Sequence, residues 1–200
     1  MSGAFNFSLN SLFEKYLNLI ILIVKLHINL INKIESNSTL KKNIYIETTI
    51  PSFYYETRSE PEMIARRNWT RKWWEQYNKE YEMVTSEAVL DELENGEYPY
   101  KKETLKLIDN LSILAIEEEI IEIAQVYIRH HLMPDDIAGD ALHLAVASYY
   151  KCDFLLTWNC KHLANVNKID HIRRVNMLLD LFTPMLITPL EFIEEESYGE

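Results

Sequence analysis

Short apolar runs alternate with helix-like segments from Asn43 almost to the end of the chain, and this alternation constrains the fold more than any other feature. Each run is rich in β-branched, aromatic or leucine side chains and has the length of a strand. Strands joined through helices lie parallel, with helices on both faces of the sheet. We therefore expect an α/β fold, a three-layer α/β/α sandwich with a central parallel sheet of about five strands. The expected strands are residues 43–47, 81–86, 112–116, 154–157 and 185–188.

Helix signals fill the intervals between these strands. The segment TTIPS after the first strand predicts a break, and Pro61 inside a first turn predicts the start of a long helix that ends near residue 81. Gly96 stops the helix after the second strand, and Thr188 with Glu191 forms a capping box that opens the last helix. The remaining helices are expected at about 87–95, 100–110, 117–133, 136–150 and 169–181.

The charge balance limits how the chain can bind nucleic acid. It has 20 Lys and Arg against 31 Asp and Glu, a net charge of -11 at pH 7, which opposes diffuse attraction to phosphates. Nucleic acid must therefore be bound by a local basic patch or through metal ions, and the acidic surface equally suits a basic protein partner. The 4 glycines are not spaced for a dinucleotide-binding or phosphate-cradling loop.

The two cysteines indicate a reducing compartment. Cys152 and Cys160 flank the fourth expected strand, and an extended path between them at about 3.3 Å per residue is far too long for a disulfide. We therefore expect free thiols and a cytoplasmic location.

The first forty residues differ from the rest of the chain. Residues 17–31, LNLIILIVKLHINLI, are almost continuously apolar and are interrupted by Lys25 and His27. A spanning helix needs about 20 apolar residues and disfavours a central cation. We therefore favour a helix that packs on the domain or on a partner, or a mistakenly extended start, over contact with a membrane. Residues 1–40 are expected to form an N-terminal apolar extension, helical over much of its length, and 34–42 read as a polar linker.

Oxygen-bearing side chains occur where ligands bind in parallel α/β folds, beyond the carboxyl ends of the strands. Glu47 ends the first expected strand, and Thr157 and Asn159 come at the end of the fourth. Glu92 lies on the helix after the second strand, and Asp140 lies in the first turns of the helix that leads to the fourth. We expect these side chains to meet at one rim of the sheet.

Carboxylates that meet at one rim repel one another unless a cation holds them together. Mg²⁺ and Mn²⁺ are hard ions that select oxygen ligands, so the sequence predicts a site for one of them. For Asp140 the alternative is a charge that only stabilises the N-terminus of its helix.

Other carboxylates compete for these roles. Glu87, Asp91 and Glu94 share the helix of Glu92, and periodicity alone does not choose among them. Asp153 precedes the fourth strand, about 15 to 20 Å from the far end by strand rise, and is interpreted as a turn or cap residue.

The histidines are interpreted as structural. His143 shares a helical face with Asp140 through i, i+3 spacing. A packed or hydrogen-bonded ring is favoured there, and a substrate contact is the alternative. The others considered have no Cys or His partner at zinc spacing; they are His130, His131 and His162.

Four segments together resemble a known family. DALHLAVA followed by DFLLTWNCKHLAN, with IYIETTIPSFY and VLDELENG earlier in the chain, look like the motifs of PIN-domain proteins and most resemble VapC-type toxins of prokaryotic toxin–antitoxin pairs. The resemblance covers residues 43–196, the expected PIN domain, and DALHLA paired with LLTWN is its most specific part.

This resemblance implies a ribonuclease H-like sandwich in which acidic residues bind one or two Mg²⁺ or Mn²⁺ ions and cut single-stranded RNA. The family usually has Asp at the first acidic position and often at the last, so Glu47 and Asn159 depart from its pattern. A catalytically weak or inactive binding or regulatory module is therefore the alternative. The motifs place metal ligands and catalytic residues at Glu47, Glu92, Asp140 and Asn159. Apart from the resemblance, Thr48 and Thr157 could orient a metal-bound water or a ligand carboxylate, and a hydroxyl bonded only to the backbone is the alternative.

One segment mixes cations with stackable rings. ARRNWTRKWWEQY, residues 65–77, offers a contact for single-stranded RNA through Arg66, Arg67, Arg71 and Lys72. At helical spacing, Trp69, Trp73 and Tyr77 also form one apolar stripe, for which core or a dimer interface is the favoured interpretation.

The resemblance also implies partners. A small basic antitoxin is expected to bind near the acidic rim, where an Arg or Lys among Glu47, Glu92 and Asp140 would displace metal. A homodimer is implied in the same way.

Overall fold

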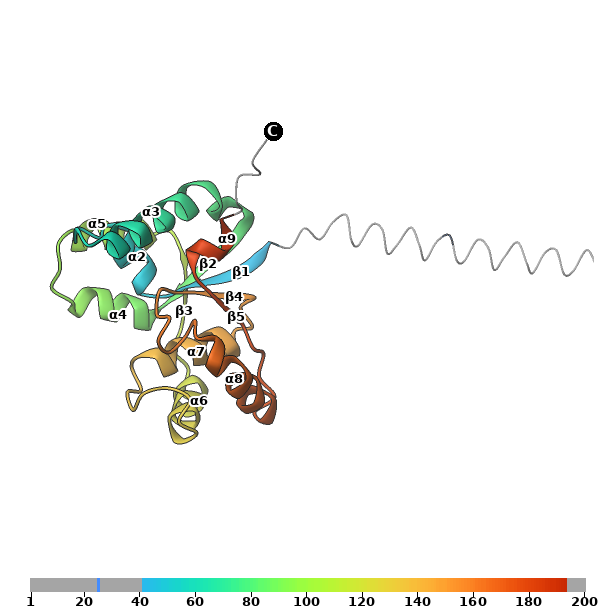
Figure 1. Ribbon diagram of the computed structural model, residues 1–200. Coiled ribbons are helices and arrows are strands. Elements are labelled where there is room, and N and C mark those ends of the chain that lie inside the picture. Colours follow the sequence, from blue (N-terminus) through green and yellow to red (C-terminus); the bar gives the residue numbers. More distant parts are fainter. Residues whose placement is uncertain (1–24, 26–40, 194–200) are drawn as a thin grey trace, which may run out of the picture. The chain divides into compact units, whose positions relative to one another are not determined.

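A five-stranded parallel sheet forms the centre of the domain (Figure 1). The computed structural model describes residue 25 and residues 41–193. The chain divides into two units, 1–40 and 41–200, and the predicted extension lies, apart from Lys25, outside the described residues. The strands are β1 (Lys42–Ile46), β2 (Tyr81–Ser86), β3 (Ser112–Leu114), β4 (Phe154–Leu156) and β5 (Met185–Ile187), in the order β3-β2-β1-β4-β5.

Helices cover both faces of this sheet, which confirms the predicted three-layer sandwich (Figure 1). One group contains α2 (Thr49–Tyr54), α3 (Pro61–Gln76), α4 (Glu87–Asn95), α5 (Lys101–Ile108) and α9 (Pro189–Phe192), with a short 3-10 turn, η1 (Asn78–Glu80). In this group α2 contacts α3 and α5, α3 contacts α9, and α4 contacts α5. The other group contains α6 (Glu118–Arg129), α7 (Asp140–Tyr149) and α8 (Val166–Leu178).

Some helix boundaries differ from those expected. Residues 49–54 form α2, where a break was predicted, because Pro51 lies in the first turn, where its missing N–H costs no helical hydrogen bond. The helix α7 begins at Asp140 and not at Asp136, since the Asp136 carboxylate accepts a hydrogen bond from the Ala138 N–H at 3.1 Å and holds a turn there. The long helix α3 ends at Gln76.

The core lies on both faces of the central strands. Ile44, Ile46 and Leu155 are fully buried, as expected for strands that helices cover on both sides. Trp73 is also fully buried, and Trp69 and Tyr77 pack against the core. The aromatic stripe of α3 is therefore part of the core, which was one of the two interpretations favoured from the sequence, the other being a dimer interface.

A buried polar contact joins the three helices of the second group. The Tyr127 hydroxyl of α6 donates to Asn176 Oδ1 of α8 at 2.6 Å. The Asn176 amide donates in turn to Ser148 Oγ of α7 at 3.1 Å and to the Phe182 carbonyl at 2.9 Å. Because α7 begins with Asp140 and carries His143, this contact helps to fix the position of both side chains.

Among the residues that the structure describes, no helix is both long and apolar enough to cross a membrane. The apolar run 17–31, on which the question of membrane contact depends, lies almost entirely outside that part of the chain.

We expect Asn176→Ala to lower the free energy of unfolding by about 2 to 4 kcal/mol, because it leaves the buried hydroxyls of Tyr127 and Ser148 and the carbonyl of Phe182 without this partner. Urea unfolding followed by circular dichroism measures the change. Asn167→Ala, at an exposed position on the same helix, is the matched control. Equal stability of the two variants would contradict the role assigned to Asn176.

Candidate metal centre

The site lies where the strand order of the sheet reverses. The chain places β1 between β2 and β4, and ligands bind beyond the carboxyl ends of the strands at such a point. Ile46 and Leu156 are register partners, as are Leu156 and Ile187, so the three strands end at the same level. The residues that come directly after β1 and β4, Glu47 and Thr157, therefore leave the sheet side by side.

Glu47 is a buried carboxylate held by three donors. It is 4% exposed, and its Oε2 accepts hydrogen bonds from the Thr49 N–H at 3.1 Å, the Thr49 hydroxyl at 2.5 Å and the Thr157 hydroxyl at 2.7 Å. Burial raises the pKa of Glu47, and the charge of His143 and these hydrogen bonds oppose the rise. A positive charge nearby therefore favours the ionised form.

His143 lies between carboxylates and is bonded at both ring nitrogens. It is 1% exposed; its Nε2 lies 3.2 Å from Glu92 Oε1, and its Nδ1 lies 2.8 Å from the Tyr45 hydroxyl. That hydroxyl lies 2.7 Å from Ser86 Oγ. The interpretation of His143 as a hydrogen-bonded ring is confirmed, with the addition that the ring belongs to the acidic site.

The charges around His143 and Glu92 shift both pKa values. Burial works to lower the pKa of His143, but the hydrogen bond to Glu92 and the charges of Glu47, Glu92 and Asp140 raise it above its usual value. Burial works to raise the pKa of Glu92, but its hydrogen bond to His143 and the imidazolium charge lower it. An imidazolium between the two glutamates thus supplies part of the positive charge that they require.

Of the acids on α4, only Glu92 takes part in these contacts. Asp91 and Glu94 are exposed, and Glu87 accepts a hydrogen bond from the Ile116 N–H at 3.0 Å, at the end of β3. Of the acids on this helix, Glu92 is therefore the one that lies with Glu47 and His143. Asp153 binds the Asn43 N–H at 2.8 Å at the opposite end of the strands, as expected of a cap residue.

Ligand atoms from three elements are close enough to share one ion. One atom each of Glu47, Glu92 and His143, hereafter the ligand cluster, lie within 4.8 Å of one another. Two atoms that bind one ion at about 2.1 to 2.3 Å are at most about 4.2 to 4.6 Å apart. The residues present therefore fit a divalent cation after only a small closure.

Asp140 and Asn159 form a neighbouring pair. The Asn159 Nδ2 donates to Asp140 Oδ1 at 2.7 Å, and the Asn159 N–H donates to Thr157 Oγ1 at 2.9 Å. Because Thr157 also bonds Glu47, one hydrogen-bonded path connects the pair to the ligand cluster. Burial raises the pKa of Asp140, which the charges of His162 and His143 and the Asn159 bond oppose. The side-chain NH₂ of Asn159 thus faces Asp140, and its side-chain oxygen accepts a hydrogen bond from the His162 N–H at 3.1 Å.

The two threonines expected to support the site differ in what they do. Thr157 bonds the Glu47 carboxylate directly. The Thr48 hydroxyl is buried and makes no hydrogen bond of normal geometry in the described part of the chain, but it lies close enough to Glu92 to help lower the pKa of that carboxylate. Sequence reasoning missed Thr49, which donates twice to Glu47 and accepts from the Trp158 N–H at 2.8 Å. Its position two residues after an acid that ends a strand was the available signal.

The basic residues of α3 divide into two kinds. Arg71 donates to the Tyr54 carbonyl at 2.8 Å, and Arg67 donates to the Glu56 carbonyl at 3.2 Å, so both hold the chain at the end of α2. Arg66 instead lies over the rings of Phe53 and Trp158, at 5.6 Å and 5.5 Å from their centroids. Because Trp158 stands between Thr157 and Asn159 in the chain, Arg66 is the arginine next to the site. Lys72 lies half-buried on the same helix.

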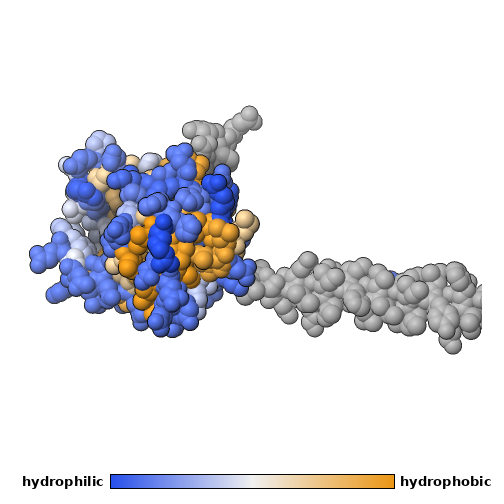
Figure 2. All heavy atoms as spheres, turned by 90° about the horizontal axis from the view of Figure 1, so that it is seen from below, coloured by the Kyte–Doolittle hydropathy of each residue, from blue (hydrophilic) through white to orange (hydrophobic). Residues whose placement is uncertain are grey.

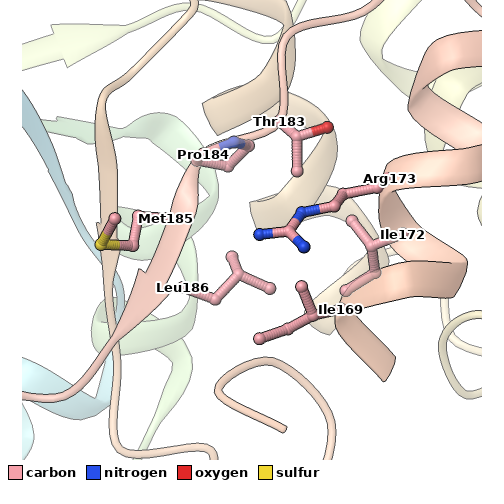
Figure 3. Close-up of a pocket in the computed structure, with 7 residues that line it drawn as sticks. All are labelled: Ile169, Ile172, Arg173, Thr183, Pro184, Met185 and Leu186. Atoms are coloured by element: carbon pink, nitrogen blue, oxygen red, sulfur yellow. The ribbon is translucent and has the colours of Figure 1, made fainter. Parts of the chain in front are cut away.

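A separate cavity of about 160 Å³ lies between α8 and β5 (Figure 3). Its walls are largely apolar, with Ile169 and Ile172 on one side and residues 183–186 on the other, and the Arg173 side chain extends between them. The described residues that line it include no carboxylate, so it does not compete with the ligand cluster as a metal site.

Comparisons with known proteins found distant structural relatives. No curated protein matches the chain. A chain of a toxin–antitoxin complex from Klebsiella pneumoniae is 17% identical, with a TM-score of 0.47 and coverage of 73% of this chain and 97% of that one. A second match is a chain of VapBC2 from Rickettsia felis, in a structure that also contains a DNA fragment from the VapBC2 promoter. It is 15% identical, with a TM-score of 0.43 and coverage of 73% of this chain and 98% of that one.

A family model adds the decisive match. The model described as PIN domain matches residues 44–168. That range is more than half of the chain and contains the ligand cluster and the Asp140–Asn159 pair. The chain therefore belongs to the PIN domain family.

Proposed function

We propose that this protein is a metal-dependent endoribonuclease that hydrolyses phosphodiester bonds of single-stranded RNA, and that it is the toxin of a toxin–antitoxin pair. PIN domains are usually nucleases, and this chain belongs to that family. The observation that carries the proposal is the ligand cluster, whose atoms lie within 4.8 Å of one another at the carboxyl end of the sheet, with the Asp140–Asn159 pair joined to it through Thr157.

The residues proposed to hold one or two Mg²⁺ or Mn²⁺ ions are Glu47, Glu92, Asp140 and Asn159. A bound ion of this kind lowers the pKa of its water and neutralises phosphate charge. The protein's part is to hold its carboxylates in place. Thr49 and Thr157 orient Glu47, His143 orients Glu92, and the Asn159 amide orients Asp140.

Arg66 is proposed as the residue of α3 that contacts the RNA backbone. Its guanidinium lies over the rings of Phe53 and Trp158, an arrangement that leaves its N–H groups for a phosphate. Arg67 and Arg71 already bind backbone carbonyls, so we assign them a structural role. A local cation of this kind is what a chain of net charge -11 needs in order to bind RNA.

The alternative function is a catalytically weak or inactive binding or regulatory module. It is favoured by the depth of Glu47, which is 4% exposed with Oε2 bonded to three donors, and by the Asn159 NH₂ that faces Asp140. Calorimetric titration with Mn²⁺ discriminates between the two functions. Absence of heat at millimolar metal, together with uncut RNA, would favour the module.

Two partners are proposed, a basic antitoxin and a second copy of the chain. A basic antitoxin could place an Arg or Lys among the carboxylates of the site, in keeping with the acidic charge of the chain. For a homodimer, α8 offers Val166, Met177 and Leu178, which are 78%, 74% and 75% exposed. Figure 2 views the domain from below relative to Figure 1, and hydrophobic residues are gathered on that side. A cytoplasmic location is proposed because Cys152 and Cys160 are free thiols, as is usual in a reducing compartment.

Asp140→Asn should abolish RNA cleavage and leave the fold intact. The substitution removes a negative charge from the site while keeping the size of the side chain, and Asp140 is only half-buried. We expect a loss of about 100-fold or more in cleavage rate, which corresponds to about 2.7 kcal/mol of transition-state stabilisation. Gel analysis of single-stranded RNA with Mg²⁺ or Mn²⁺ measures it, and Asp136→Asn, at an exposed position before α7, is the control. Full activity of Asp140→Asn would refute the proposed role of Asp140, and full activity of the wild type in excess EDTA would refute the metal dependence of cleavage.

Arg66→Ala should weaken RNA binding and make it less sensitive to salt. Loss of one phosphate contact to a single strand lowers the slope of log K against log salt concentration by about 0.7. Fluorescence anisotropy with labelled RNA in EDTA measures binding without cleavage. Arg129→Ala, which removes an exposed arginine at the end of α6, is the matched control. An unchanged slope for Arg66→Ala would remove Arg66 from the RNA contact.

Without metal, the protein should become less stable as the pH rises above neutrality. The pKa of His143 is raised above 6.5 in the folded state, so the folded state holds this proton more tightly than the unfolded chain. The stabilisation is complete below about pH 6.5 and is lost as the pH rises through the folded pKa. Burial raises the pKa of Glu47 also, which acts in the same direction starting from a lower pH.

Urea unfolding in EDTA between about pH 6 and 9 measures this dependence. We expect the decline in wild type and a flatter profile in His143→Gln, which lacks the titrating group. Parallel profiles for the two proteins would show that His143 does not carry the effect.

A further inference from the structure

We propose that His143 binds the metal ion directly through Nε2, so that the centre is a mixed nitrogen and oxygen site that prefers Mn²⁺ to Mg²⁺. The inference rests on the proposed function, since it concerns the ion that the nuclease would use. It assigns to His143, which stands within the segment DALHLAVA, a ligand role that the resemblance did not give it, and it adds a preference that oxygen ligands alone would not create.

The position of the ring is the first support. His143 Nε2 faces Glu92 Oε1 at 3.2 Å, and both residues share with Glu47 a set of atoms within 4.8 Å. An ion at the centre of that set would replace the contact between the imidazole and the carboxylate with a bond to each. The ring is 1% exposed, so the packing of α7 holds it toward the carboxylates.

The second support is the partner of the other ring nitrogen. Histidines that bind metal almost always have that nitrogen hydrogen-bonded, and the Tyr45 hydroxyl lies 2.8 Å from His143 Nδ1. A hydroxyl both donates and accepts. When Tyr45 donates to Ser86 Oγ, 2.7 Å away, it can accept from Nδ1–H, and the lone pair of Nε2 then faces the ligand cluster.

The same three side chains also support the other tautomer. When Tyr45 donates to Nδ1, the Nε2–H donates to Glu92, and His143 only positions that carboxylate. Conversion of one arrangement into the other requires the Tyr45 hydroxyl to reverse and the ring proton to move from Nε2 to Nδ1 by exchange with solvent, but no movement of heavy atoms. A bound ion selects the tautomer that presents a lone pair.

The ligand set decides the preference among ions. Carboxylates and water suit Mg²⁺ and Mn²⁺ alike, but imidazole suits later and softer divalent ions better than Mg²⁺. A site with Glu47, Glu92 and an imidazole therefore prefers Mn²⁺ to Mg²⁺ more strongly than a site of oxygen ligands alone does.

Pulsed electron paramagnetic resonance of the Mn²⁺-loaded full-length protein tests the bond. Mn²⁺ bound to a histidine nitrogen shows modulation from ¹⁴N, which changes to the ¹⁵N pattern when histidine is ¹⁵N-labelled. We expect that modulation in the wild type, and its absence there would overturn the proposal whatever the variants do. His143→Gln should lose it, and His162→Gln, which replaces a histidine that acts on Asp140 by charge, should keep it. Loss in His162→Gln instead would assign the nitrogen to that residue and overturn the proposal.

Calorimetry with Mn²⁺ and with Mg²⁺ tests the preference. Tyr45→Phe keeps the ring and removes the hydroxyl that orients His143; we expect it to lower Mn²⁺ affinity by about 10- to 100-fold and Mg²⁺ affinity by less. Equal losses for both ions would overturn the preference. RNA cleavage without nitrogen modulation would support the nuclease and overturn the bond between His143 and the metal. Nitrogen modulation without RNA cleavage would support that bond and count against the nuclease.

Discussion

Glu47 places a carboxylate where the water that normally stabilises its charge is almost absent. The end of β1 lies between two strands and beneath helices on both faces, so the next residue in the chain is buried. Thr49 and Thr157 supply hydrogen bonds but no charge, and the remaining requirement is a cation. His143 supplies positive charge beside this carboxylate, and Glu92 and Asp140 add negative charge that attracts it.

The structure meets part of this requirement with a side chain. The imidazole of His143 stands between Glu47 and Glu92, and its pKa is raised by the hydrogen bond and charges that it receives. With a divalent ion present, the ion itself would compensate the carboxylates. The polar contacts of Tyr45 and Ser86 hold this imidazole, so both residues belong to the site although neither is an acid.

Alternation of strands and helices was enough to predict the parallel sheet, its layers and the rim at which Glu47 and Thr157 meet, because these depend on periodicities that each segment carries by itself. Boundaries set by local hydrogen bonds were harder. The turn at Asp136 delays the start of α7, and residues 49–54 form a helix despite Pro51. Each of these depends on where one side chain or one ring lies within a turn, which periodicity does not encode.

The sequence by itself determined which chemical groups the centre can use and which strand ends and helices carry them, because residue order decides which side chain stands at the end of each strand. Tertiary structure decided the partners of these groups. On α4, Glu92 faces His143, whereas Asp91 and Glu94 do not. On α3, Arg66 lies beside Trp158, whereas Arg67 and Arg71 bind the end of α2. The Asn159 amide donates to Asp140. The reason is that neighbours on one helix differ by only about 100° of rotation, and only the packing of that helix against others decides which of them meets a residue distant in the chain.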